Sequence, residues 1–242
     1  MGKIKIAAWS MGLILLVGSP IVGPIGCSVQ MVTMDPRKVE ADQLSKQGQQ
    51  QFNGSQFEGA FQSWEKALKI YRDIKDRLGE GQSLGSLGNA YYSLGNYPKA
   101  IEFQKQSLAI ARELKDRLGE GNALANLGIT YVSLGNYPKA IEFQKQSLAI
   151  ARELKDRNGE QLVLHNMASA FEKQKQPESA INYYQQAVVV IEGIRQDNRK
   201  LSPAIQASYT KTVAKTYKNL AKLLIAQGRR EKAQKVLDLL KR

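Results

Sequence analysis

The chain has 242 residues, a formal net charge of +13, one cysteine and one histidine. A single cysteine excludes an internal disulfide, and these counts also exclude a zinc site built from several Cys and His ligands. The charge is uneven, because residues 195–242 contain thirteen Lys and Arg against three Asp and Glu. This basic end suits nucleic acid, acidic lipid or an acidic partner, and a solvated helical face is the simpler alternative.

The first thirty residues have the layout of an export signal or a membrane anchor. Lys3 and Lys5 precede an uncharged stretch of 21 residues from Ile6 to Gly26. A basic start followed by an apolar stretch is typical of secretory signals. The stretch is also long enough to span a bilayer if it stays uncleaved. We therefore expect an exported protein, with residues 31–39 as a short tether.

Cys27 stands at the end of this apolar stretch. The sequence Ile25-Gly26-Cys27-Ser28 resembles the lipobox of bacterial lipoproteins, in which the cysteine is lipidated and becomes the mature N-terminus. Pro24 departs from the aliphatic residue that the lipobox favours. The alternatives are plain cleavage, an uncleaved anchor, or a structural cysteine. The resemblance implies a position on the periplasmic side of a bacterial membrane, tethered or, after cleavage, secreted.

A segment of 25 residues occurs twice without change. Ser93–Arg117 recurs as Ser133–Arg157, displaced by 40 residues. Self-similarity at such a period predicts a solenoid of stacked units. Aligned on this period, small residues recur in two columns, Gly48, Gly88, Gly128 and Ala168 in one and Ala60, Ala100, Ala140 and Ala180 in the other. Small residues at these positions allow two successive helices to approach closely.

The turns between helices can also be predicted. Gly95 and Gly135 are each followed by Asn-Tyr-Pro, which indicates a left-handed residue at one helix end and a proline in the first turn of the next helix. The expected N-caps of the helices that follow are Asp76, Asp116 and Asp156.

Charged residues near the end of each unit are spaced for pairing within one helix. Arg112 with Asp116, and Glu113 with Arg117, are four residues apart. Such pairs stabilise a helix by tenths of a kcal/mol.

These columns resemble the tetratricopeptide repeat, a helix–turn–helix unit. Its signature of a large residue, Leu, Gly, Tyr, Ala and an aromatic falls on Leu124, Leu127, Gly128, Tyr131 and Ala140, with Phe143 one place before the expected aromatic. The resemblance implies an all-α, right-handed superhelical solenoid of antiparallel helix pairs. About four regular pairs are expected over residues 40–196. The next small position, Ala233, comes thirteen residues late, which predicts one longer atypical pair over residues 197–242.

The order of the segments resembles the repeat region that precedes the CHAT domain (caspase-like, associated with tetratricopeptide repeats) in bacterial proteins. In that family the segment similar to Glu231–Arg242 leads into a peptidase domain with a catalytic His and Cys. His165 lies in a repeat helix and Cys27 in the export signal, so neither matches these roles. The resemblance implies the interaction arm of such a protein without its enzyme.

Stacked helix pairs curve, and their first helices line the concave side. The expected partner-binding positions there are Gln82, Asn89, Tyr92, Asn122, Asn126, Ile129, His165, Ser169, Lys215, Lys218 and Lys222. Asn amides can bond both backbone groups of an extended peptide, and the three lysines share a face that suits an acidic segment. The alternatives are a solvated face for the Asn and Lys residues and a packing role for His165.

These observations favour a non-enzymatic scaffold that binds a partner protein or peptide, with an acidic segment as one option. A second hypothesis is a detached regulatory arm of a CHAT-type peptidase. Nucleic-acid binding through the basic end is less favoured, because interleaved exposed aromatic residues are lacking. We expect membrane contact through the N-terminal segment, and no cofactor, metal or small-molecule substrate.

Overall fold

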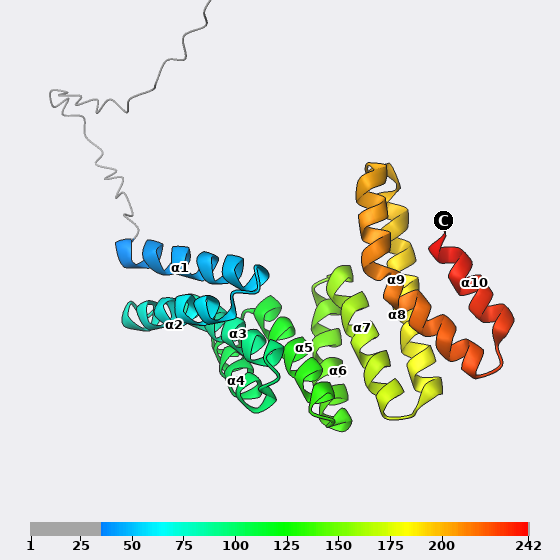
Figure 1. Ribbon diagram of the computed structural model, residues 1–242, viewed down its shortest axis with the longest axis horizontal. Helices are drawn as coiled ribbons and strands as arrows, with labels where there is room; N and C mark the ends of the chain where they lie inside the picture. The colour runs from blue at the N-terminus through cyan, green and yellow to red at the C-terminus, as the bar shows by residue number, and fades with distance from the viewer. Residues whose placement is uncertain (1–34, 242) are drawn as a thin grey trace, which may run out of the picture. The chain divides into compact units, whose positions relative to one another are not determined.

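The computed structural model describes residues 35–241 of the chain. Within this range the structure is all-α, with ten α-helices, one short 3₁₀-helix and no strand (Figure 1). The α-helices are α1 (Pro36–Asn53), α2 (Phe57–Asp73), α3 (Arg77–Ser93), α4 (Tyr97–Glu113), α5 (Arg117–Ser133), α6 (Tyr137–Glu153), α7 (Arg157–Lys173), α8 (Pro177–Asp197), α9 (Pro203–Ala226) and α10 (Arg230–Leu240). The expected export signal, Cys27 and residues 31–34 of the tether lie outside the described residues.

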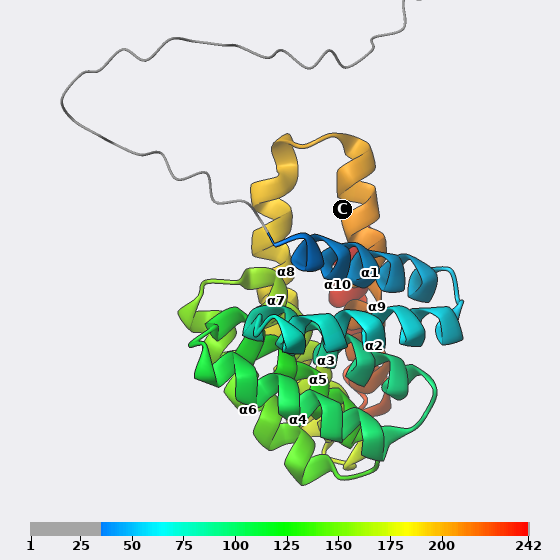
Figure 2. The same ribbon diagram turned by 90° about the vertical axis from the view of Figure 1, so that its left-hand side faces the viewer.

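Successive helices pack as antiparallel pairs, α1 with α2, α3 with α4, α5 with α6, α7 with α8 and α9 with α10 (Figure 2). Each pair contacts the next, and the first helices α1, α3, α5 and α7 also contact one another in sequence. The first helices therefore lie on one side of the stack. Four regular pairs and one longer C-terminal pair confirm the predicted helical solenoid.

The backbone repeats at half the period of the sequence. Helices α2 to α7 each have 17 residues and are each followed by a three-residue connection. Gly95 and Gly135 adopt the expected left-handed conformation, with φ of 76° and 82°. The connections between pairs use the same geometry with Lys75, Lys115 and Lys155. A non-glycine residue there costs on the order of 1 kcal/mol, so these turns are held by the packing of the helices that they join.

Side-chain caps begin the helices as predicted. The carboxylate of Asp116 accepts a hydrogen bond from the N–H of Gly119 at 2.9 Å, and Asp76 and Asp156 do the same at the start of α3 and α7. Asp35 caps α1 in a similar way, ahead of a proline in the first turn. Because this cap starts α1 at Pro36, residues 36–39 are helical, and their expected place in the tether is wrong.

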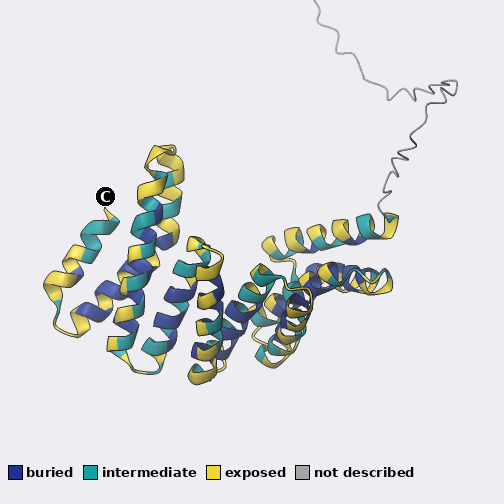
Figure 3. Ribbon diagram, turned by 180° about the vertical axis from the view of Figure 1, so that it is seen from behind, coloured by how far each residue is buried: buried dark blue, intermediate teal, exposed yellow. Residues whose placement is uncertain are grey.

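The small-residue columns lie where the two helices of each pair are closest. The four alanines of the second column are fully buried. A Cβ added at Gly88 would lie 2.8 Å from Cγ of Gln104, and one at Gly128 would lie 2.7 Å from Cγ of Gln144. The predicted close approach is confirmed, and the side chain that faces each glycine comes from four residues after the alanine. Figure 3 shows the buried residues concentrated between facing helices.

These facing side chains also bond to the backbone of the first helix. Nε1 of Trp64 donates to the carbonyl of Ser45 at 3.1 Å, and Nε2 of Gln144 donates to the carbonyl of Ala125 at 3.2 Å. Both acceptors lie three residues before the small residue of their helix, at Gly48 and Gly128. The same contact therefore holds two different pairs, one through an indole and one through an amide.

Ion pairs join neighbouring helices as well as residues one turn apart on the same helix. Nε of Arg112 in α4 lies 2.9 Å from Oε1 of Glu120 in α5, and Arg117 of α5 also pairs with Glu120. The expected pairs of Arg112 with Asp116 and of Glu113 with Arg117 are wrong, because Asp116 caps α5 and Glu113 pairs with Arg77 on the first helix of its own pair. Burial raises the pKa of Glu120, but hydrogen bonds from both arginines outweigh it, and the pKa is lowered.

The thirteen additional residues near the C-terminus mainly lengthen two helices. Helix α8 has 21 residues and α9 has 24, while α10 has only 11. Between α8 and α9 lies a 3₁₀-helix, Asn198–Lys200. In Figure 1 the end of α8 and the start of α9 extend together as a helical hairpin beyond the neighbouring helices.

We expect Gly88→Ala to lower the free energy of unfolding by about 1–3 kcal/mol, because the new methyl group overlaps Gln104 in a tightly packed contact. Urea denaturation followed by circular dichroism measures this. Gly85→Ala is the matched control in the same helix, since its Cβ would lie 3.3 Å from the Ser107 hydroxyl. Helix propensity favours alanine there by about 1 kcal/mol, so equal losses in both variants would contradict the assigned contact.

Candidate functional site

A hollow of about 280 Å³ lies between α3 and α5 on the side of the first helices. It brings together four of the predicted groove residues, Gln82 and Asn89 from α3 and Asn122 and Asn126 from α5. Gln82, Asn89 and Asn122 are exposed, and Asn126 is half-buried. None of the three asparagine amides bonds to another described residue, so their donors and acceptors are open to a ligand.

The hollow exists because α3 has two glycines on this face. Gly81 and Gly85 both line it, and the Ser107 hydroxyl from α4 donates to the carbonyl of Gly81 at 2.8 Å. The residue in place of Gly85 is Ala125 in α5 and His165 in α7. The corresponding hollow between α5 and α7 is only about 50 Å³. The hollow is thus larger where this column holds glycine than where it holds alanine.

Exposed leucines form an apolar rim along the two hollows. Leu78 and Leu114 line the larger hollow, and Leu118, Leu154 and Leu162 line the smaller one. Their exposed fractions run from 41% to 55%. Isolated exposed leucines are common on protein surfaces, but a row of them beside a concavity is typical of interaction sites. Our sequence analysis did not select Leu78 or Leu114.

Two predicted groove residues take part in packing near the rim. Tyr92 is half-buried, its ring lies 5.8 Å from that of Tyr97, and its hydroxyl oxygen accepts a hydrogen bond from Ser133 at 3.2 Å. Ile129 is half-buried on α5. Neither lines the α3–α5 hollow. They belong to the same row of helices but not to its deepest part.

His165 lies between α7 and the last pair. Its Nδ1 is 2.9 Å from the Thr216 hydroxyl, and its ring packs edge to face on Tyr184 at 5.3 Å. Burial, with a smaller contribution from the positive charge of Lys215, lowers the pKa of His165 to about 4. The imidazole is therefore neutral at neutral pH and acts as a packing residue at this junction, where Ser169 is also half-buried.

The three predicted lysines, Lys215, Lys218 and Lys222, are all exposed on α9. None forms an ion pair with another described residue. They lie apart from the α3–α5 hollow, which they do not line. The predicted site residues therefore divide into an amide-rich set on α3 and α5, a packing residue on α7 and a basic set on α9.

Residues 35–241 hold no group of three or more His, Cys, Asp or Glu side chains placed to bind a metal ion. Across the same range, every helix is too short or too polar to cross a membrane.

Stacked antiparallel pairs with their first helices on one side define a helical-repeat protein. The tetratricopeptide repeat family matches residues 48–113, 87–153 and 119–190, and the chain belongs to this family. Repeats of this fold generally mediate protein–protein interaction and are typically non-enzymatic scaffolds. No match was found among curated protein sequences.

Solved structures with the same fold share little sequence with this chain. BtubC (BKLC) from P. vanneervenii is 19% identical, with a TM-score of 0.70 over 85% of this chain and 80% of that one. A putative kinesin light chain from Podospora anserina with nearly identical TPR-like repeats is 19% identical, with a TM-score of 0.65 over 86% and 96%. A Rap protein complexed with Competence and Sporulation Factor is 15% identical, with a TM-score of 0.65 over 83% and 52%. These likenesses show the fold.

We expect acid to destabilise the junction around His165. The folded protein disfavours the charged imidazole, so stability is full above about pH 6.5 and falls as the pH approaches 4. Between pH 7 and 4.5 the wild type should lose about 2 kcal/mol more than His165→Gln, whose amide can still bond to Thr216. Urea denaturation of both proteins across this pH range measures the difference. Parallel stability curves would contradict the buried, neutral histidine.

Proposed function

We propose that this protein is a non-enzymatic scaffold that binds an extended peptide segment of a partner protein between α3 and α5. The observation that carries the proposal is the hollow of about 280 Å³ with open asparagine amides on both sides. Its walls come from two successive repeats, so the site needs the solenoid and not one helix pair. A bound segment would lie across the row of first helices.

The chemistry of the hollow suits a peptide that places one apolar side chain inside. Gly81 and Gly85 leave the space, while Leu78 and Leu114 provide an apolar rim. Burying one large apolar side chain stabilises a complex by roughly 1.5–3 kcal/mol. Asn89, on α3, faces this same space. Amides such as this one both donate and accept, so they can bond the N–H and C=O groups of an extended backbone.

Another protein with this fold has been solved in a complex. The Rap protein of similar fold was solved with Competence and Sporulation Factor bound. At 15% identity this likeness supports only the capacity of such a solenoid to hold a ligand. A partner with acidic side chains would also suit the exposed lysines on α9, at positions 215, 218 and 222.

The cellular setting is part of the proposal. We infer export through residues 1–30 and attachment to the periplasmic side of a bacterial membrane through a lipid on Cys27. The motivation is the lipobox-like Ile25-Gly26-Cys27-Ser28. Cys27→Ser should move the protein from the membrane to the soluble fraction after cell lysis and centrifugation. Continued sedimentation with membranes would favour an uncleaved anchor instead.

The second candidate function is that of a regulatory arm for a CHAT-type peptidase. Its support is the resemblance of Glu231–Arg242 to the segment that precedes that domain. In this case the peptidase itself would be the partner, and the same groove would hold one of its segments. The two hypotheses differ in the partner and not in the binding surface.

The groove is tested by selecting peptides from a displayed random library on the full chain. We expect the selected peptides to bind Asn122→Ala/Asn126→Ala at least about tenfold more weakly, because each lost hydrogen bond costs about 1 kcal/mol. The matched control is Asn182→Ala, which removes an exposed amide from the second-helix side on α8. Binding that is unchanged in the double variant, or reduced equally in the control, would contradict the proposed site.

A further inference from the structure

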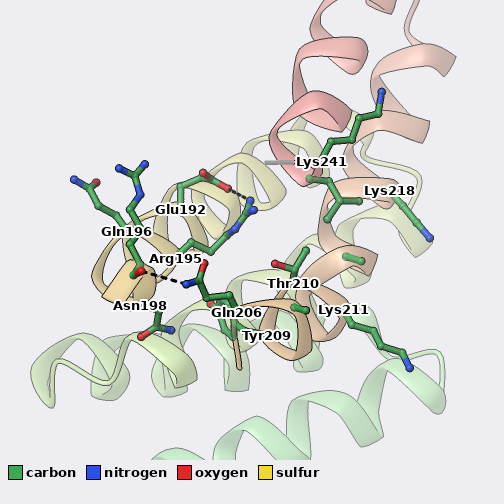
Figure 4. Close-up of a pocket in the computed structure, with 14 residues that line it drawn as sticks. Glu192, Arg195, Gln196, Asn198, Gln206, Tyr209, Thr210, Lys211, Lys218 and Lys241 are labelled. Atoms are coloured by element: carbon green, nitrogen blue, oxygen red, sulfur yellow. Dashed lines mark hydrogen bonds and ion pairs between the residues drawn. The ribbon is translucent and has the colours of Figure 1, made fainter. Parts of the chain in front are cut away.

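A second and larger hollow, of about 600 Å³, lies among α8, α9 and α10 (Figure 4). Its position follows from unequal helix lengths, because α8 and α9 are extended while α10 has only 11 residues. The end of α10, at Leu240 and Lys241, lines the hollow together with the extended parts of α8 and α9. The hollow is thus a property of the atypical C-terminal pair and is absent from the regular repeat design.

One charged group inside the hollow has a structural role. Nη1 of Arg195 donates to the carbonyl of Leu239 at 2.7 Å and pairs with Glu192 at 2.9 Å. Glu192 also accepts a hydrogen bond from Tyr217. Arg195 therefore holds the C-terminal end of α10 against α8. Glu192 is the only acidic residue among those that line the hollow, and its charge is balanced by Arg195.

The remaining charge on the hollow is positive and unbalanced. Arg199, Lys211 and Lys218 line it, are exposed, and form no ion pair with another described residue. Lys241 lines it as well and pairs with Asp238 at 3.3 Å. Figure 4 shows the three labelled lysines along one side of the hollow, with their ammonium groups apart from one another. Such an arrangement suits several anionic groups spaced along a chain better than it suits one small ion.

The spacing of the lysines matches an extended polypeptide. Lys211 and Lys218 are seven residues apart, which places them about 10 Å apart along the α9 axis. An extended chain advances about 3.3 Å per residue and every second side chain shares a face, so acidic side chains two or four residues apart, at about 7 or 13 Å, bracket this distance. Lys215 and Lys222 continue this row on the same helix.

We propose that the hollow among α8, α9 and α10 is a second binding site, for an extended acidic segment of a partner polypeptide. The amides of Gln196 and Asn198 at its edge can bond a peptide backbone. A concave site does not fit a flat bilayer. The Tyr209 hydroxyl is enclosed and its ring half-buried, so it offers no platform for stacking nucleic-acid bases. The inference rests on the proposed function only in taking a polypeptide as the ligand.

The test uses the full chain and a fluorescein-labelled octaglutamate, with fluorescence anisotropy as the readout. We expect octaglutamate to bind, octaglutamine not to bind, and the affinity to fall with added salt as charges are screened. Lys211→Gln/Lys218→Gln should weaken binding roughly tenfold. The matched control is Lys232→Gln/Lys235→Gln, which removes two exposed charges from α10 outside the hollow and should change the affinity less than about twofold.

Two further comparisons separate this site from the others. Octaglutamate has no apolar side chain for the α3–α5 hollow, so Asn122→Ala/Asn126→Ala should bind it as the wild type does, whatever the outcome at that groove. A labelled oligothymidine and phosphatidylserine vesicles are the competing ligands. No binding of octaglutamate, equal losses in both lysine variants, or tighter lysine-dependent binding of either competing ligand would overturn the proposal.

Discussion

The structure depends on one contact that recurs in the first four helix pairs, in which a large side chain of the second helix fills the space left by a small residue of the first. The contacts are Trp64 at Gly48, Gln104 at Gly88, Gln144 at Gly128 and Tyr184 at Ala168. Because the small residue leaves the backbone of the first helix uncovered, the side chain from the second helix can bond to a backbone carbonyl there, as Trp64 and Gln144 do. Each pair packs against the next, so the distance between the helices of one pair affects how the following pair stacks on it.

The same use of small residues produces the candidate groove. Gly88 faces Gln104 from the other helix of its pair, whereas Gly81 and Gly85, beside Ile110 and Ser107 of α4, line the hollow on the inner side of α3. In the next unit the residue equivalent to Gly85 is Ala125, and the hollow there is smaller. Copied units can therefore present different binding surfaces, because the packing contact and the groove use different faces of one helix.

Much of the fold was predictable because it is local. The glycine turns and the aspartate caps each depend on residues within one or two turns, and both are confirmed. The ion pairs were not predictable, because Arg112 pairs with Glu120 on another helix and not with Asp116, which is one turn away in the sequence. Of the candidate site, the asparagines of α3 and α5 do gather at one hollow. His165 lies outside this hollow, on α7, where it bonds to Thr216 of α9.

The helical-repeat class, the number of pairs and the atypical C-terminal pair are readable in the amino-acid sequence, since they follow from periodicity and from small residues at fixed spacing. Where space remains between the helices depends on how they pack in three dimensions. The hollow at Gly85 depends on the side chains of α4 and α5 that line it. The hollow beside Lys211 depends on α10 being too short to cover the first turns of α9. A cavity is bounded by side chains from several helices, so no single stretch of sequence contains it.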